Sequence, residues 1–153
     1  MTLWSSLNKR VKFLNTVISE LGLEGITAVH GRAEDFGRNR VSRETFDICV
    51  SRAVANLSTL SEYCMPLVKP GGYFVSYKSG KLDEELVNGQ GAISKLGGEI
   101  EKIERFSLPN SDERDAGEGK EDKGHLFQVS AQGGNAVKGA AQIKESTIRQ
   151  FDF

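Results

Sequence analysis

Apolar residues cluster in short runs along the first two thirds of the chain. These runs lie at residues 2–4, 26–31, 46–51, 73–78 and 99–108, and polar residues or glycines separate them. Apolar runs of this length, bounded by turn-forming residues, predict β-strands. The third run carries apolar residues on both sides, which is typical of a central parallel strand.

Apolar residues with helical spacing follow the first of these predicted strands. They form a single face, made of Leu7, Val11, Leu14, Ile18 and Leu21. Ser5 or Ser6 is expected to cap this helix, because a serine oxygen can accept from a free amide of the first turn. Gly22 is expected to end it.

Two further helices are predicted downstream. One covers 57–68 with Pro66 near its end, and the other lies in 82–96, where Gly89 and Gly91 weaken it. Strands that alternate with helices predict an α/β fold, with a mostly parallel sheet and helices on both faces.

The carboxyl ends of the predicted strands define a candidate site. Ligands of parallel sheets bind at this edge. The residues expected there are Trp4, Ser5 and the segments 30–34, 51–53 and 78–80.

Composition excludes some classes of protein and leaves others open. The chain has 153 residues, the size of one domain, and its net charge of -1 argues neither for nor against nucleic acid. No run approaches the roughly 20 apolar residues that span a bilayer, and the amino-terminal residues do not resemble a signal peptide. We therefore expect a cytoplasmic protein that binds neither membrane nor metal. Cys49 and Cys64 form no CxxC motif and are expected to be buried thiols.

Five polar residues near the expected strand ends each allow two interpretations. Glu34 and Asp35 either accept hydrogen bonds from a ribose or an adenine amino group, or cap a following helix. Arg52 either binds a carboxylate bidentately or forms an internal salt bridge, for instance with Glu34. His30 is structural more often than catalytic in such a position, and Lys78 is either a site residue or a solvated charge.

Basic residues form two groups that could contact phosphates. The first is Lys9, Arg10 and Lys12, on or near the first helix, and the second is Arg38, Arg40 and Arg43, in a loop. Such residues more often form a solvated face. The sequence has no P-loop, no GxGxxG, no metal-ligand spacing and no nucleophile motif.

Three long segments together resemble one family. They are "LWSSLNKRVKFLNTVISELGLEGITAVHGRAEDF", "FDICVSRAVANLSTLSEYCMPLVKPGGYFVSYKSG" and "RFSLPNSDER". From about Thr2 to Arg114 they resemble the GidB/RsmG family of S-adenosylmethionine-dependent methyltransferases, which modify N7 of a guanine in small-subunit (16S) ribosomal RNA. The resemblance implies that residues 1–114 form a partial, Rossmann-like class I methyltransferase domain.

The resemblance also implies a cofactor, a partner and residue roles. The cofactor is S-adenosylmethionine, the partner is small-subunit ribosomal RNA, and the intact family member is expected to be a monomer. Ala33, Glu34 and Arg52 match cofactor-binding positions, and Lys78 matches a lysine near the substrate guanine. Lys9, Arg10, Lys12 and Lys78 are the expected RNA contacts. Guanine N7 already carries a lone pair, so catalysis would depend on positioning rather than on a general base.

Two departures from the family concern the cofactor. Ser5 stands where the family normally has an acidic residue, which can accept from both ribose hydroxyls more strongly than a neutral hydroxyl can. The family also has upstream helices, a first strand and a glycine-rich turn, for which the sequence shows no counterpart. We therefore expect exposed strand edges and weak binding of S-adenosylmethionine by this chain alone.

The segment 115–153 lacks the apolar pattern of the rest and is expected to be disordered. Family members instead continue with an apolar strand and a basic ending. Residues 127–141 can be encoded so that reading one nucleotide further gives "FKYPRKAGTPSKEP", which is that ending. We therefore predict a change of reading frame near Arg114 and Asp115; the alternative is an authentic disordered extension.

A second class of function stays open on the sequence alone. The same partial domain could serve as a non-catalytic RNA-binding or interaction module. Binding of RNA without binding of cofactor would distinguish this module from an enzyme.

Overall fold

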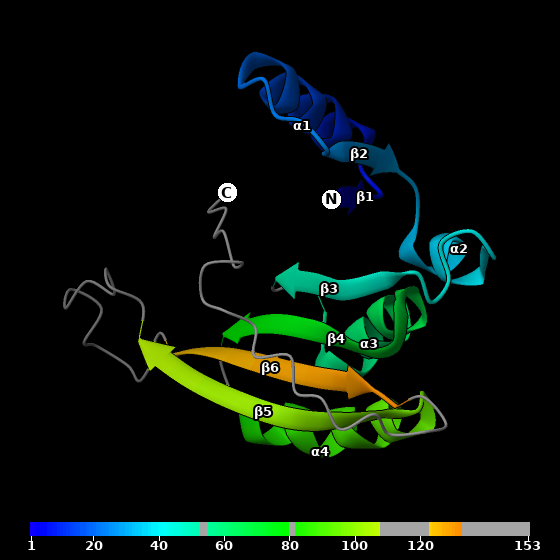
Figure 1. Ribbon diagram of the computed structural model, residues 1–153. Helices are drawn as coiled ribbons and strands as arrows, with labels where there is room; N and C mark the ends of the chain where they lie inside the picture. The colour runs from blue at the N-terminus through cyan, green and yellow to red at the C-terminus, as the bar shows by residue number, and fades with distance from the viewer. Residues whose placement is uncertain (53–54, 80–81, 108–122, 133–153) are drawn as a thin grey trace.

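The computed structural model describes residues 1–52, 55–79, 82–107 and 123–132. Figure 1 shows the arrangement of the helices and strands. In chain order they are β1 (Thr2–Ser5), α1 (Asn8–Glu20), β2 (Thr27–His30), α2 (Ala33–Arg38), β3 (Phe46–Arg52), α3 (Leu57–Cys64), the 3₁₀ helix η1 (Met65–Leu67), β4 (Val68–Ser79), α4 (Leu82–Lys95), β5 (Gly98–Ser107) and β6 (Lys123–Ala131).

The strands form two hydrogen-bonded sheets. β1 and β2 pair in parallel, and the other four strands follow the order β3-β4-β6-β5. β3 and β4 are parallel, whereas β6 runs antiparallel to both β4 and β5. From top to bottom, Figure 1 shows β2, β1, β3, β4, β6 and β5. The expected α/β fold with mostly parallel strands is confirmed.

β6 corrects the expectation that the tail is disordered. Residues 123–131 form a strand that is hydrogen-bonded on both sides, between β4 and β5. His125, Phe127 and Val129 alternate along this strand, and their exposed fractions are 5%, 0% and 0%. Every second residue of the strand therefore faces the core. The apolar pattern of this segment is too short to have predicted this buried face from the sequence. The rest of 115–153 lies outside the described residues.

β3 also differs from expectation, because it is covered less than a central strand would be. Among the strands in the described ranges it pairs with β4 alone. Ile48 and Val50 are 37% and 60% exposed, while Cys49 on the opposite face is buried. Within the described residues, β1 likewise pairs with β2 alone. Among these residues, the strand pairing agrees with the expected exposure of strand edges.

The boundaries of several elements differ from the sequence prediction. Leu7 occupies the N-cap position of α1 and makes no side-chain cap, so the predicted serine cap is wrong. The Ser5 hydroxyl instead accepts a hydrogen bond from the Leu7 amide (3.2 Å) in the preceding turn. Gly22 ends this helix as expected, with a φ of +59°. α3 ends at Cys64, because the chain continues as the 3₁₀ helix η1, which contains Pro66. None of the helices in the described ranges is long and apolar enough to cross a membrane.

The main core lies between the larger sheet and the helices α3 and α4. Its largest fully buried side chains include Phe74, Phe127, Leu57 and Ile93. Gly89 of α4 permits the close approach of the two helices, since a Cβ at this position would lie 2.7 Å from Leu57 Cδ2. A Cβ at Gly91 would meet nothing within 4 Å. Only one of the two glycines that weaken the helix is therefore required by packing.

Exchanging each glycine of α4 for alanine is expected to change stability in opposite directions. Gly91→Ala should raise the free energy of unfolding by about 0.5–1 kcal/mol, because alanine favours the helical backbone. Gly89→Ala should lower it by about 1 kcal/mol, because crowding against the buried Leu57 exceeds that gain. Urea unfolding of both variants measures this. Equal effects at the two positions would contradict the packing role of Gly89.

Cys49 and Cys64 are free, buried thiols, as the sequence predicted. Both belong to the buried core cluster. Interaction with the Cys49 thiol and burial raise the pKa of the Cys64 thiol above its ordinary value. The folded chain therefore retains a proton at alkaline pH that the unfolded chain releases.

Stability is accordingly expected to fall as the pH rises above about 8.5, where thiols of the unfolded chain ionise. Because the folded chain keeps Cys64 protonated, the free energy of unfolding should decrease by up to about 1.4 kcal/mol per pH unit. Urea unfolding under reducing conditions, at neutral pH and at about pH 10, measures the slope. Cys64→Ala should be less stable at neutral pH, but its free energy of unfolding should depend less steeply on pH. An unchanged slope would show that other groups cause the pH dependence.

Candidate functional site

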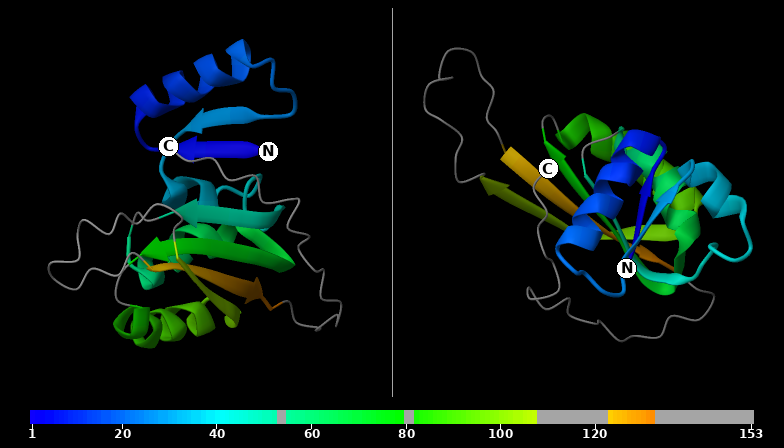
Figure 2. Two further views of the ribbon diagram at one scale, coloured as in Figure 1. Left: turned by 90° about the vertical axis from the view of Figure 1, so that its left-hand side faces the viewer. Right: turned by 90° about the horizontal axis from the view of Figure 1, so that it is seen from above.

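The carboxyl ends of four parallel strands lie at one edge of the molecule. In the left view of Figure 2, the arrowheads of β1, β2, β3 and β4 point the same way, and that of β6 points the opposite way. Ser5 lies opposite His30 at the end of the first pair, and Arg52 lies opposite Tyr77 near the end of the second. The strand ends that the sequence predicted as a site thus face the same side of the molecule. Residues 53 and 80, which were part of that prediction, lie outside the described residues.

Backbone and side-chain contacts fix the ends of β1 and β2 against each other. The Gly31 amide donates to the Ser5 carbonyl (3.1 Å), and His30 Nε2 lies 3.2 Å from the Ser6 carbonyl. A Cβ at Gly31 would lie 2.8 Å from the ring of Phe36, so the chain turns tightly here. This contact agrees with the interpretation of His30 as a structural rather than a catalytic residue.

Ala33 and Glu34 begin the short helix α2, directly after β2. Arg32 precedes the helix and makes no side-chain cap, while Glu34 and Asp35 stand in the first turn. The interpretation of these two acids as helix caps is therefore wrong. Glu34 is exposed, so its carboxylate is available at the edge of the sheet.

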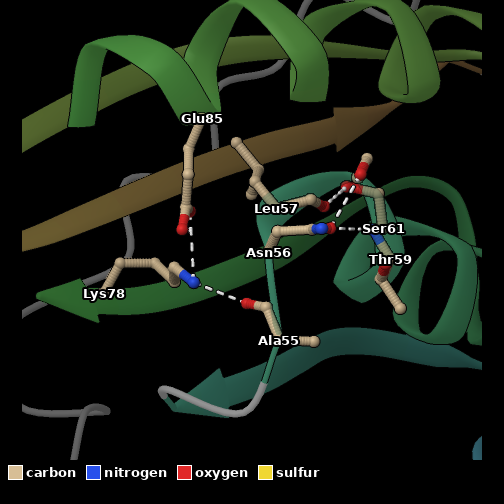
Figure 3. Close-up of polar contacts among 8 residues, drawn as sticks. Ala55, Asn56, Leu57, Thr59, Ser61, Lys78 and Glu85 are labelled. Carbon is tan, nitrogen blue, oxygen red and sulfur yellow. Dashed lines mark hydrogen bonds and ion pairs between the residues drawn. The ribbon is translucent and has the colours of Figure 1, made fainter. Parts of the chain in front are cut away.

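Arg52 and Lys78 end the neighbouring strands but have different surroundings. Arg52 is the last residue of β3 and is exposed. The side chain of Lys78 is only 10% exposed, and its Nζ lies 3.1 Å from Oε2 of Glu85. The same ammonium donates to the Ala55 carbonyl at 2.5 Å (Figure 3). Lys78 is thus no solvated charge: it connects β4, α4 and the turn before α3.

Asn56 forms the adjacent end of α3. Its side-chain oxygen accepts from the Thr59 amide (3.0 Å) and from the Ser58 hydroxyl (2.8 Å). A pocket of about 170 Å³ opens beside it. The residues that line this pocket are Asn56, Leu57, Ser58, Glu85 and Asn88.

Sequence reasoning did not identify Asn56 or Glu85. An asparagine just before an apolar helical run is a recognisable capping signal. Glu85 had no local signal, because its pairing with Lys78 depends on how α4 packs on the sheet.

The basic residues near α1 lie close to the same edge. Lys9, Arg10 and Lys12 are exposed in the first turns of α1, which begins directly after β1. Arg43 of the second basic group has structural contacts instead. It pairs with Glu44 (3.4 Å) and donates to the Gly37 carbonyl (3.1 Å).

Solved structures with this arrangement define the class of protein. A SAM-dependent methyltransferase from Methanosarcina mazei superposes with a TM-score of 0.60 at 12% identity, covering 86% of this chain and 81% of that one. M. jannaschii TYW2 in complex with AdoMet gives a TM-score of 0.58 at 10% identity, covering 84% and 55%. The fold is that of the Rossmann-like class I methyltransferases.

Sequence comparison then gives the family. The family described as "rRNA small subunit methyltransferase G" (GidB) matches residues 1–114, and the chain belongs to it. The ribosomal RNA small subunit methyltransferase G of Lactobacillus acidophilus is 51% identical over 113 residues, which are 74% of this chain and 47% of the relative. That of Lachnoclostridium phytofermentans is 54% identical over 110 residues, or 72% and 46%. The chain therefore spans about half the length of these relatives.

Proposed function

We propose that this chain provides part of the site of an S-adenosylmethionine-dependent methyltransferase that modifies guanine N7 in small-subunit ribosomal RNA. The observation that carries the proposal is the position of Ser5, Ala33, Glu34 and Arg52, each at or just after the carboxyl end of a parallel strand. This is the edge at which such sheets bind nucleotides. Membership of the rRNA small subunit methyltransferase G family supports the reaction.

The side chains at this edge fit the polar groups of S-adenosylmethionine in part. The exposed carboxylate of Glu34 can accept hydrogen bonds from ribose hydroxyls or an adenine amine, and Arg52 can pair with a carboxylate. Ser5 offers only a neutral hydroxyl, and this hydroxyl already accepts from the Leu7 amide. The cofactor would supply an electrophilic methyl group.

The proposed reaction needs no general base from this chain. The lone pair of guanine N7 is available in the neutral base, so the protein has to align the base and exclude competing orientations. Lys78 contributes by fixing the Ala55 turn, and a direct contact of its ammonium with the guanine would require it to exchange a present partner. Lys9, Arg10 and Lys12 would bind RNA phosphates, and affinity would then fall with salt.

A chimeric enzyme tests this function directly. Residues 1–114 replace the matched 113 residues of the Lactobacillus acidophilus relative, and methylation of N7 is measured on small ribosomal subunits. Glu34→Gln and Arg52→Met should raise the KM for S-adenosylmethionine, because each removes a charge that faces the cofactor. Glu24→Gln, an exposed acid after α1, is the matched control. A chimera that binds the cofactor but is inactive would contradict the proposed function. If Glu24→Gln raised the KM as much as Glu34→Gln and Arg52→Met, the assignment of Glu34 and Arg52 to the cofactor site would be wrong.

The isolated chain is expected to bind S-adenosylmethionine only weakly. Within the described residues, the proposed contacts would come from the ends of β1, β2 and β3, and none of these ends forms a glycine-rich turn. Calorimetric titration of residues 1–153 tests this expectation, and micromolar affinity would refute it. RNA binding without cofactor binding would favour the alternative interaction module.

A further inference from the structure

We propose that the pocket beside Asn56 receives the Watson–Crick edge of the target guanine, and that Glu85 is the residue that distinguishes guanine from adenine. The inference deepens the proposed function and rests on it for the identity of the base. It concerns recognition of the base alone and requires no contact with S-adenosylmethionine.

The first observation is the place and size of the pocket. It has a volume of about 170 Å³ and lies between the start of α3 and the helix α4. Asn56, on one side of it, comes shortly after Arg52 at the carboxyl end of β3. A cavity of about 150 Å³ in another protein holds a benzene ring. One ring of a purine can therefore enter this pocket while the other ring stays at its mouth.

The second observation is the chemical character of the lining. Four of the five described lining residues have polar side chains, and the fifth is Leu57. The side-chain oxygen of Asn56 already accepts from the Thr59 amide and the Ser58 hydroxyl, so its amide nitrogen is the part that can donate to a ligand. The pocket thus offers an amide donor on the side of α3 and the Glu85 carboxylate on the side of α4.

The third observation is that the Glu85 carboxylate is held in place. Its Oε2 lies 3.1 Å from Nζ of Lys78, and the same ammonium donates to the Ala55 carbonyl (Figure 3). This pairing fixes the carboxylate and compensates its charge, so RNA phosphates are repelled less. A carboxylate has about four lone-pair positions, so pairing with one ammonium leaves it able to accept further hydrogen bonds.

These groups are complementary to the Watson–Crick edge of guanine. That edge presents the acceptor O6 and two neighbouring donors, N1–H and the N2 amine. The Asn56 amide can donate to O6, while the Glu85 carboxylate accepts from N1–H and from the N2 amine. Adenine has an acceptor at N1 and no amine at C2, so the carboxylate would face a lone pair and lose both bonds.

This orientation also leaves the reacting atom accessible. N7 belongs to the five-membered ring, on the side of the base opposite N1 and N2, and would stay at the mouth of the pocket. Recognition and methyl transfer would then use different edges of the base. Direct attack by the N7 lone pair requires this separation, because N7 has to be aligned with the methyl group.

Nucleotide titrations of the full chain of 153 residues test the proposal without cofactor. The probes are guanosine, inosine and adenosine monophosphate, which share ribose and phosphate and differ in the base. The backbone amide NMR shifts of Leu57, Ser58, Glu85 and Asn88 report binding in the pocket. We expect the guanosine nucleotide to bind at least about tenfold more tightly than the adenosine nucleotide. The inosine nucleotide, which lacks the N2 amine, should lie between them.

Equal affinities for the three nucleotides, or no shift of the pocket amides, would overturn the proposal. These outcomes differ from a failure of the proposed function. The titration contains no cofactor and measures no methyl transfer, so a negative result leaves the reaction of the chimera untouched. An inactive chimera, in turn, would leave a measured preference for guanine in place.

Glu85→Gln makes the test specific to this residue. Glutamine keeps one acceptor and replaces the other with an N–H donor, so the preference for the guanosine over the adenosine nucleotide should fall at least about fivefold. The guanosine and inosine nucleotides should then bind equally. A purely structural role would weaken all three nucleotides by the same factor, and such a result would contradict the proposal.

Glu62→Gln is the matched control, because Glu62 is an exposed acid of α3 outside the pocket lining, and it should leave the affinity ratios unchanged. If Glu85→Gln does not fold without its ion pair to Lys78, Glu85→Asp replaces it. Aspartate keeps the charge but withdraws the carboxylate from the base, so the preference for guanine should again decrease. Unchanged ratios in Glu85→Asp would count against the proposal.

Discussion

Replacing Phe127 with alanine is expected to lower the free energy of unfolding by about 3–5 kcal/mol. Phe127 is 0% exposed in β6 and belongs to the core cluster with Phe74, Leu57 and Ile93. Removing the ring would leave a cavity beneath α3 and α4, in addition to the lost transfer free energy. Urea unfolding followed by circular dichroism measures the change.

Phe13→Ala is the matched control for this substitution. Phe13 on α1 is 53% exposed, so its truncation should cost far less. A disordered tail would make the effect of Phe127→Ala negligible. That result would remove β6 from the fold and restore the interpretation based on composition alone.

Lys78→Met is expected to lower the free energy of unfolding by about 2–4 kcal/mol. The substitution leaves the Glu85 carboxylate without its cation and the Ala55 carbonyl without its donor. The cost lies below that of a fully buried pair because Glu85 is 30% exposed. Thermal unfolding and the exchange rates of the Asn56 to Thr59 amides measure the two consequences.

A double-mutant cycle with Glu85→Leu separates the pair from its surroundings. The double variant should recover part of the loss, because no buried charge is then unpaired. Lys102→Met is the control, since Lys102 pairs with Glu104 at the surface and is 58% exposed, and it should cost less than about 1 kcal/mol. Equal losses for Lys78→Met and Lys102→Met would show that Lys78 does not support the turn.

The sequence predicted those features that depend on local periodicity. Helical spacing identified α1 and α3, and short apolar runs identified five of the six strands. The parallel order of these strands was sufficient to place Glu34 and Arg52 at one edge. Their contacts with a cofactor stay a proposal that the chimera tests.

Features that depend on distant pairing could not be predicted in the same way. β6 has a short apolar pattern, and its stability comes from two hydrogen-bonded neighbours and a shared core. The exposure of β3 reflects which strands lie beside it and not its own composition. The hypothesis of a changed reading frame stays a prediction, which the gene sequence across codons 110–120 tests.

The position of β6 has a consequence for the order in which the chain folds during synthesis. Within the part of the chain that the structure describes, β6 is the last strand in sequence, yet it lies between β4 and β5 and is the only strand that pairs with β5. While the chain emerges from the ribosome at about 5–20 residues per second, β5 must wait unpaired until β6 has followed it. The larger sheet is therefore completed from its interior, when β6 pairs with β4 and thereby provides the edge on which β5 can pair.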